Sequence, residues 1–226
     1  IKDTHPMTLL VLTRHGHVEG ISPPRFRGRH DLPLTPAGRN QARQLGAFLA
    51  TRPPIDAVYT SPLSRCIDTG AAIAAATDVG ATAIPELEDI DYGAWTGKTH
   101  EEGERSDPER YALWWHAPQL VRPPKGDSLQ DLVARTAEAV RQIIDRHPQG
   151  RVVLVGHDSS NRALLLTLLD LPLSAFWRFE QSPCNLTEIE VSPKGVRVHS
   201  INETLHLQER PLHQGSGQPA SKEQAS

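Results

Sequence analysis

Basic side chains stand directly after three strand-like stretches of this 226-residue chain. The stretch 8–13 precedes Arg14-His15-Gly16, the stretch 56–61 precedes Arg65, and the stretch 151–155 precedes Gly156-His157. Guanidinium groups bind phosphate oxygens through a planar fork of N–H donors, and a neutral imidazole is a nucleophile. These residue types therefore predict a site for a phosphate dianion, where a histidine accepts the phosphoryl group covalently.

Phosphoryl transfer through a histidine requires two further functions. Cationic groups must neutralise the equatorial phosphate oxygens, and a carboxylic acid must protonate the departing alkoxide. Two arginines and a second histidine supply the positive charge, so we predict no metal ion and no other cofactor. The eleven histidines include no pair at metal-ligand spacing on one helix face. We expect His17, His30, His100 and His116 to lie in loops, with one of them lining the pocket.

The elements that must position these residues alternate along the chain. Strands are predicted at 8–13, 56–61, 81–84 and 151–155, and helices at 36–51, 62–77, 128–147 and 160–169. The stretches 186–191 and 196–201 predict a terminal hairpin. This pattern indicates an α/β fold, a three-layer sandwich with a mostly parallel central sheet and helices on both faces. Ligands bind such sheets beyond the carboxyl ends of the strands, where the basic residues stand.

The domain organisation is predicted to be simple. Residues 7–210 form a single domain, interrupted by a lid-like excursion at 85–126 that holds three of the four tryptophans. Residues 1–6, before the only methionine, are interpreted as an extension, and 211–226 as a disordered tail rich in Gly, Ser, Gln and Pro. Packing of the excursion onto the body is the favoured interpretation of Trp114 and Trp115, and a substrate-stacking lid is the alternative.

Composition excludes several classes of function. The formal net charge is −3, so the chain lacks the basic footprint of a protein that binds nucleic acid or an anionic membrane. No apolar run approaches the roughly 18 residues of a spanning helix. The two cysteines, Cys66 and Cys184, are interpreted as reduced thiols of a cytoplasmic protein, although they could form one bridge. The oligomeric state is not predicted.

Five segments together resemble the histidine phosphatase (phosphoglycerate mutase-like) superfamily. They are RHG at 14–16, GRHDLPLTPAG at 28–38, SPLSRCIDT at 61–69, GAWTG at 93–97 and GHDSSNR at 156–162. The first motif alone is weak, but five segments in the same order are highly specific. The resemblance implies a phosphoglycerate mutase-like fold, with His15 as the phosphorylated nucleophile, Arg14 and Arg65 as phosphate clamps, and His157 as the second phosphate-binding histidine. Gly16 lets the backbone turn beside the ligand.

The general acid departs from the family pattern. Members usually carry a glutamate four residues before the glycine of the fourth segment, and this chain has Asp89 there. Asp158 is the second candidate, because His157-Asp158 resembles the His-Asp pair of the superfamily's acid-phosphatase and phytase branch, in which the aspartate donates the proton. Glu88 is the third, although adjacent side chains tend to point apart.

The loop after Gly16 differs as well. Many members have an asparagine five residues beyond this glycine, and this chain has Ile21. Arg25, Arg27 and Arg29 either hold a second anionic group of the substrate or are simply solvated. We assign substrate binding to Gly16, Arg27 and Asp158.

Three functions are compatible with these residues. The favoured one is a metal-independent phosphatase that hydrolyses small phosphate monoesters through a phosphohistidine on His15. A cofactor-dependent phosphoglycerate mutase is the second, disfavoured by the modest excursion at 85–126. A non-catalytic phosphate-binding protein is the third, suggested only by the unusual Asp89.

Overall fold

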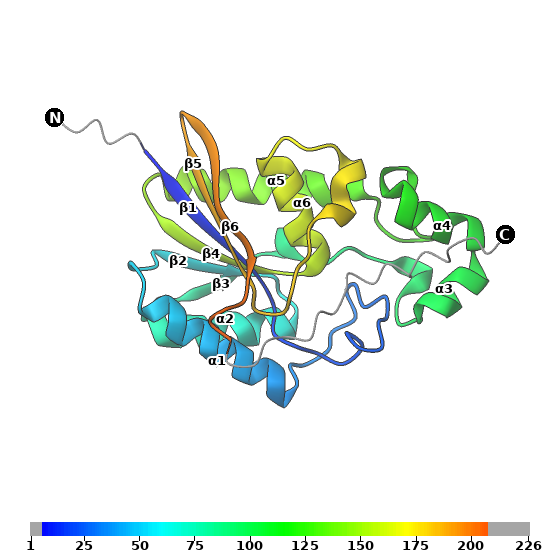
Figure 1. The fold of residues 1–226 in the computed structure, drawn as a ribbon, viewed down its shortest axis with the longest axis horizontal. Helices are drawn as coiled ribbons and strands as arrows, with labels where there is room; N and C mark the ends of the chain where they lie inside the picture. Colours follow the sequence, from blue (N-terminus) through cyan, green and yellow to red (C-terminus); the bar gives the residue numbers. More distant parts are fainter. Residues whose placement is uncertain (1–5, 208–226) are drawn as a thin grey trace.

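The computed structural model describes residues 6–207 (Figure 1). Apart from Pro6, the predicted N-terminal extension lies outside the described residues, and so does the predicted disordered tail at 211–226. No helix within the described part is long and apolar enough to cross a membrane.

A six-stranded sheet forms the centre of the fold, in the order β3-β2-β4-β1-β5-β6. The strands are β1 (Thr8–Arg14), β2 (Ala57–Thr60), β3 (Ala81–Ala83), β4 (Arg151–Gly156), β5 (Leu186–Ser192) and β6 (Gly195–Glu203). The first four pair in parallel, whereas β5 is antiparallel to both β1 and β6. The mostly parallel sheet and its terminal hairpin are therefore as the sequence predicts.

Helices cover both faces of the sheet (Figure 1). On one face α1 (Pro36–Ala50) packs against α2 (Ser64–Thr77), and on the other α5 (Leu129–Arg146) packs against α6 (Asp158–Leu168). Alternate residues of a strand face opposite sides. Val11 accordingly joins the core beneath α1 and α2, while Leu10 and Leu12 join the core beneath α5 and α6. Because both faces are buried, apolar residues fill the centres of β1 (9–12) and β4 (152–155).

Local signals fix where the main helices begin. Thr35 caps α1, with its Oγ1 accepting a hydrogen bond from the Gly38 amide at 3.1 Å. Ser128 caps α5 in a capping box with Asp131, whose carboxylate accepts from the Ser128 amide at 2.8 Å. Helix α2 begins at Ser64, two residues after the predicted start at Pro62.

The excursion between β3 and α5 folds into short helices. They are η1 (Pro85–Leu87), η2 (Gly93–Trp95), α3 (His100–Ser106), α4 (Pro108–His116) and η3 (Pro118–Leu120). Trp95 and Trp114 form an aromatic core with Phe26 and with Phe176 of η4 (Leu173–Arg178). Trp114 and Trp115 are both buried, so they pack as the favoured interpretation expects, but both also line the cavity described below, and the substrate-stacking role stays a prediction. The aromatic core holds α3 and α4 beyond one end of the sheet (Figure 1).

The two cysteines are buried in the core that lies beneath α1 and α2. Neither Cys66 nor Cys184 is part of a disulfide, in agreement with the interpretation as thiols. Burial raises the pKa of both thiols far above the usual range, so neither is a reactive nucleophile.

Candidate active site

The fold brings the basic residues of three strand ends together. His15 follows β1, Arg65 lies in the first turn of α2 after β2, and His157 follows β4. Strands β1 and β4 are in register up to the pair Arg14 and Gly156, so the two histidines leave the sheet side by side. Their ring centroids are 5.3 Å apart, and each side chain is at most 1% exposed.

Two glycines let the loop of His15 pass close to α1. A Cβ atom on Gly16 would collide with the carbonyl oxygen of Gly38, and one on Gly38 would collide with that of His17. The amide of Gly16 also donates to Thr69 Oγ1 at 3.1 Å, which ties the same loop to α2. Contacts with α1 and α2 thus fix the turn that follows β1.

The imidazole of His15 is arranged as a nucleophile. Its Nδ1 lies 2.7 Å from the carbonyl oxygen of Gly16, which can only accept, so Nδ1 carries the proton and Nε2 keeps a free lone pair. Burial lowers the pKa of His15 well below its usual value, and the charges of Arg65 and Arg14 lower it further. The ring is therefore neutral at physiological pH.

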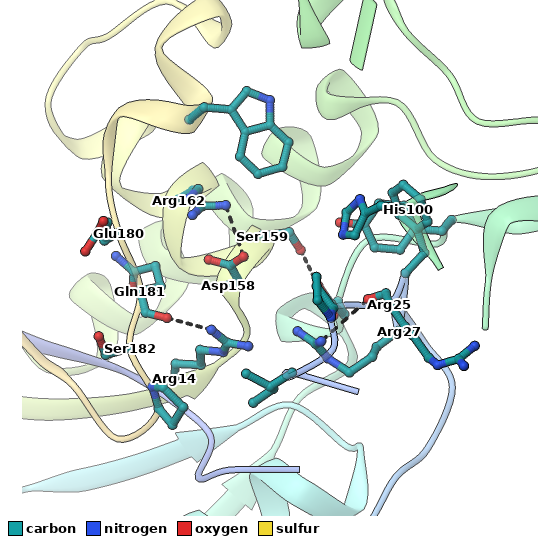
Figure 2. Close-up of a pocket in the computed structure, with 18 of the residues that line it drawn as sticks. Arg14, Arg25, Arg27, His100, Asp158, Ser159, Arg162, Glu180, Gln181 and Ser182 are labelled. Carbon is teal, nitrogen blue, oxygen red and sulfur yellow. Dashed lines mark hydrogen bonds and ion pairs between the residues drawn. The ribbon is translucent and has the colours of Figure 1, made fainter. Parts of the chain in front are cut away.

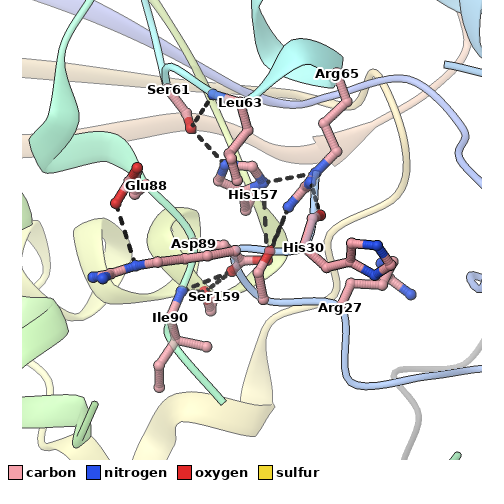
Figure 3. A network of polar contacts seen from close by, with 12 residues as sticks. Arg27, His30, Ser61, Leu63, Arg65, Glu88, Asp89, Ile90, His157 and Ser159 are labelled. Carbon is pink, nitrogen blue, oxygen red and sulfur yellow. Dashed lines mark hydrogen bonds and ion pairs between the residues drawn. The ribbon is translucent and has the colours of Figure 1, made fainter. Parts of the chain in front are cut away.

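His157 is held in the opposite tautomer. The guanidinium Nε of Arg65, which can only donate, lies 3.3 Å from Nδ1, so Nδ1 accepts. Nε2 then donates to Ser61 Oγ at 2.8 Å (Figure 3). Burial, followed by the charges of Arg65 and Arg14, lowers the pKa of His157 well below its usual value. Both histidines are thus neutral, and the arginines carry the positive charge of the site.

Arg14 and Arg65, the two arginines predicted to bind phosphate, differ in how many of their N–H groups are hydrogen-bonded. Arg65 donates to the carbonyl oxygens of His30 and Gly28 at 2.8 and 2.7 Å. Arg14 donates through Nη1 to the Gln181 carbonyl oxygen at 2.6 Å, but its buried Nε has no partner within the described structure. Burial lowers the pKa of Arg14 to about 10, so it remains charged at neutral pH. Arg14 therefore has N–H groups available for a ligand.

Asp89 lies beside His157 and Arg65 (Figure 3). It is 7% exposed, and its Oδ2 lies 3.5 Å from Arg65 Nη2 and 3.9 Å from His157 Nδ1. Its Oδ1 accepts from Ser159 Oγ and from the Ile90 amide. The shorter aspartate thus reaches the site, and a serine hydroxyl holds its second oxygen.

A half-buried arginine of α5, Arg135, holds the segment that carries Asp89. Arg135 donates to three successive acceptors, the carbonyl oxygens of Glu86, Glu88 and Asp89, at 2.9, 2.6 and 2.8 Å. Three hydrogen bonds from one planar group leave this stretch little freedom, so Arg135 positions the candidate acid.

The other two candidate acids lie elsewhere. Glu88 forms an ion pair with Arg29, with its Oε2 3.2 Å from Arg29 Nε, and does not line the cavity. Asp158 does line the cavity and pairs with Arg162 at 3.0 Å. Of the three, the structure brings Asp89 to the histidines and places Asp158 on the cavity wall.

A cavity adjoins this cluster and is lined in part by Arg14 and Arg27 (Figure 2). Arg14 and Arg27 lie on one side of it, and Asp158, Glu180 and Gln181 on another. The cavity lining also includes a group of aromatic side chains: Phe26, Tyr92, His100, Trp114, Trp115 and Trp177. His15, Arg65 and His157 are below the surface of this cavity and do not line it.

The loop after Gly16 contributes Ile21 and Arg27 to the cavity. Ile21 presents an apolar side chain where many relatives of the resembled family carry an amide. Arg27 is the arginine of this loop that lies deepest, and burial lowers its pKa. Arg29 instead forms ion pairs outside. Two histidines, His17 and His100, line the cavity rather than the single one predicted.

Four further polar residues act on this site without having been singled out from the sequence. Ser61 holds His157, Ser159 and Arg135 hold Asp89, and Gln181 holds Arg14. Ser61 stands in a quoted motif, which was a usable signal. Ser159 stands in another quoted motif, at 156–162, whereas Arg135 and Gln181 carry no motif and only tertiary structure reveals them.

Comparison with known proteins decides the family. The sequence profile of the histidine phosphatase superfamily (branch 1) matches residues 10–204. The chain belongs to this superfamily. It is 31% identical over 203 residues to phosphoserine phosphatase 1 of Hydrogenobacter thermophilus, an alignment that covers 90% of the chain and 96% of that protein. It is also 32% identical over 180 residues to a 2,3-bisphosphoglycerate-dependent phosphoglycerate mutase of Afipia carboxidovorans, covering 76% of the chain and 86% of the mutase.

A solved structure gives the same result for the fold. YhfR of Bacillus stearothermophilus superposes with a TM-score of 0.82 at 32% identity, covering 88% of the chain and 98% of that protein. The predicted phosphoglycerate mutase-like sandwich is confirmed. Within residues 6–207, no group of three or more His, Cys, Asp or Glu side chains is placed to hold a metal ion.

Proposed function

We propose that this protein is a metal-independent phosphatase that hydrolyses small phosphate monoesters through a phosphohistidine on His15. The observation that carries the proposal is the neutral, buried imidazole of His15, with a free Nε2, beside Arg14 and Arg65. A relative of known name, phosphoserine phosphatase 1, supports the same class of reaction, which is hydrolysis of a phosphoric monoester.

In the first step His15 Nε2 attacks phosphorus, and the bond from phosphorus to the ester oxygen breaks. The electron pair goes to the departing oxygen, and Asp89 in its acid form supplies the proton. Arg14 and Arg65 neutralise the equatorial oxygens, whose charge is spread over three atoms in the transition state. The phosphoryl group is then covalently attached to the ring, and the alcohol leaves through the cavity.

In the second step water replaces the histidine. Asp89, now a carboxylate, accepts a proton from the water molecule that attacks phosphorus, and the bond from Nε2 to phosphorus breaks. Inorganic phosphate is released, and Nε2 regains its lone pair. The hydrogen bond from Nδ1 to the Gly16 carbonyl oxygen keeps the His15 ring in the same tautomer throughout the cycle.

Neutral histidines suit this cycle better than charged ones. A protonated His15 has no lone pair to offer, and a protonated His157 would place a proton against the Arg65 Nε–H. The site therefore separates its functions, with nucleophilicity on the imidazole and positive charge on guanidinium groups that stay protonated at neutral pH.

The test is hydrolysis of p-nitrophenyl phosphate, with EDTA, with vanadate, and with the His15→Ala variant. We expect activity that resists EDTA, is inhibited by vanadate and disappears in the variant. An alkaline quench during turnover should trap phosphate on the protein, because phosphohistidine is stable in base. Absence of both turnover and trapped phosphate would leave the non-catalytic binding protein as the better description.

The phosphoglycerate mutase shares the first step, and the relative from Afipia carboxidovorans gives it weight. The two functions differ in what accepts the phosphoryl group, water or a second hydroxyl group. An enolase-coupled assay with 3-phosphoglycerate distinguishes them. We expect release of inorganic phosphate without formation of 2-phosphoglycerate.

A further inference from the structure

Arg29 lies in a short loop, 28–31, whose backbone holds Arg65. Arg65 Nη2 donates to the carbonyl oxygen of Gly28 at 2.7 Å, and its Nη1 donates to that of His30 at 2.8 Å. These two acceptors are the neighbours of Arg29 in the chain, one on each side. Because Arg65 is fully buried, the position of its guanidinium group depends on where this loop lies.

The same loop contacts both α2 and the segment that carries Asp89. On the side of α2, Asp31 Oδ1 accepts from the amide and the hydroxyl group of Ser64, the first residue of the helix, at 2.9 and 2.7 Å. On the other side, a Cβ atom on Gly28 would lie only 2.7 Å from the carbonyl oxygen of Ile90. The loop is thus packed against the start of one helix and against the backbone next to the candidate acid.

The side chain of Arg29 reaches the segment around Asp89 through ion pairs. Its Nε lies 3.2 Å from Glu88 Oε2, its Nη1 4.0 Å from Asp91 Oδ2 and its Nη2 3.1 Å from Asp127 Oδ2. Glu88 and Asp91 stand on either side of Asp89 in the chain. Asp127 belongs to the same unit, because its Oδ2 also accepts from the amide of Asp91 at 3.1 Å. All three pairs are therefore made with this segment or with a residue bonded to it.

The number of acidic groups distinguishes Arg29 from a single surface ion pair. One exposed pair contributes little to stability, because solvent and salt screen its charges. Here three carboxylates lie within 4.0 Å of one guanidinium group, and their side chains are only 21–34% exposed. Arg135 also pairs with Asp127, at 3.6 Å, but Glu88 and Asp91 have Arg29 as their ion-pair partner within the described structure. Without Arg29 these like charges would repel one another and displace the segment.

Arg29 does not line the cavity, so it does not contact a substrate bound there. The two groups that it connects lie close together, with Arg65 Nη2 3.5 Å from Asp89 Oδ2 (Figure 3). We propose that Arg29 is a positioning residue that fixes the separation between Arg65, which binds phosphate, and Asp89, the general acid. Its neighbours in the chain hold the first group, and its side chain holds the segment of the second. This inference rests on the proposed phosphatase activity and adds to it a residue that acts only through others.

Two measured quantities report on the two groups separately. The inhibition constant of inorganic phosphate reports how well Arg65 binds a phosphate group. The slope of log kcat/KM against the pKa of the leaving group reports proton donation by Asp89, because an alkoxide needs the proton and p-nitrophenolate does not. A variant that merely lowers the amount of folded enzyme changes neither quantity.

Arg29→Gln should change both quantities. We expect the inhibition constant of phosphate to rise about tenfold, and alkyl phosphates to lose about tenfold more activity than p-nitrophenyl phosphate, which steepens the slope. Arg29→Lys keeps the positive charge among the three carboxylates and should restore most of both quantities. Arg141→Gln is the matched control, since it removes an arginine that pairs with the exposed Glu138 and Asp145, and it should leave both unchanged.

Two further variants each affect one group. Arg135→Met loosens the backbone of the acid's segment and should steepen the slope with little change in phosphate inhibition. Asp31→Ala removes the contact with Ser64 and should weaken phosphate inhibition with little change in the slope. If Arg29→Gln behaved like either of these variants, or changed only the melting temperature, the proposed connection would be wrong.

Asp127→Asn provides a second test in case Arg29→Gln fails to fold. The amide oxygen can still accept from the backbone of Asp91, but the charge that faces Arg29 is lost. Both quantities should move in the same direction as in Arg29→Gln, by about threefold, and wild-type values would overturn the proposal. Failure of wild-type enzyme to hydrolyse p-nitrophenyl phosphate would instead count against the phosphatase. The affinity for inorganic phosphate, measured by calorimetry, would then decide whether Arg29 positions Arg65.

Discussion

The two sides of the cavity are built in opposite ways. Below it, His15, Arg65 and His157 stand at the ends of strands and in the first turn of a helix, buried and held by hydrogen bonds. On the wall above, Asp158 and Gln181 keep polar atoms without partners. The lower region is held by these hydrogen bonds, whereas the wall keeps buried polar atoms that are unpaired among the described residues.

This difference separates chemistry from selectivity. The groups proposed to carry the phosphoryl group are fixed by the sheet and by helices α1 and α2. The wall comes from the N-terminus of α6 and from the segment after η4, and it faces the aromatic residues of the excursion. A change in the lower region should therefore affect every substrate, and a change in the wall should affect substrates unequally.

The largest effect is expected from the nucleophile. His15→Ala removes the atom that forms the covalent intermediate, so turnover should fall by about 10³-fold or more with every ester. Steady-state rates with p-nitrophenyl phosphate and phosphoethanolamine would measure this loss. A variant that lost activity with only one of the two esters would contradict the separation of chemistry from selectivity.

Asp89→Asn should have the next largest effect and should depend on the leaving group. A positioned general acid contributes about 10²–10⁴-fold, but p-nitrophenolate leaves without protonation. We therefore expect a large loss with alkyl phosphates and a small one with p-nitrophenyl phosphate. A plot of log kcat against leaving-group pKa should become steeper in the variant, and an unchanged slope would remove Asp89 from the acid role.

Arg14 connects the two regions, and its charge helps to keep His15 neutral. Because activity needs unprotonated His15, it is lost as the pH falls through the pKa of that ring. Arg14→Gln removes one of the charges that lower this pKa, so the pKa rises and the acidic limb of phosphohistidine formation moves to higher pH. We also expect a rate lower by about 10²-fold.

Single-turnover rates from pH 4 to 8 would measure the position of that limb. The phosphate group of the substrate also ionises, with a second pKa of about 6. This ionisation is the same for wild type and both variants, so it does not affect the difference between their acidic limbs. Arg14→Lys keeps the charge and serves as the matched control, with its limb close to that of wild type. Coincident limbs in wild type and Arg14→Gln would show that the charge of Arg14 does not contribute to the low pKa of His15.

The smallest effect is expected from Arg135, which touches no substrate. Arg135→Met frees the carbonyl oxygens that it holds at 86, 88 and 89, so Asp89 should lose alignment and kcat for alkyl phosphates should fall about tenfold. Arg141→Met on the same helix is the control, since Arg141 pairs only with exposed Glu138 and Asp145. Equal losses with alkyl and p-nitrophenyl phosphate would indicate general damage to the fold.

Sequence patterns predict the lower region better than the wall for a physical reason. Strand periodicity and the rule that ligands bind beyond strand ends are enough to bring His15, Arg65 and His157 together. The free oxygen of Asp158 depends on where Arg162 is held by a distant carbonyl group, and no local pattern encodes that contact.

Arg135 illustrates the same limit. It lies on α5 among exposed charged residues, and nothing in the helical periodicity distinguishes it from Arg141. Arg135 differs from Arg141 because the segment 86–89 packs beside it and supplies carbonyl oxygens for its guanidinium group to bind. The tautomers of His15 and His157 are likewise set by single tertiary or backbone contacts rather than by residue type.

The close approach of Gly16 and Gly38 has a mechanical consequence. Two backbones meet there with no side chain between them, so no rotamer can absorb a displacement. The start of α1 and the loop of the nucleophile must move together, and a partial opening of α1 would displace the nucleophile while the sheet stays folded. The durability of the enzyme at high temperature would then be governed by the local stability of one surface helix rather than by that of the whole molecule.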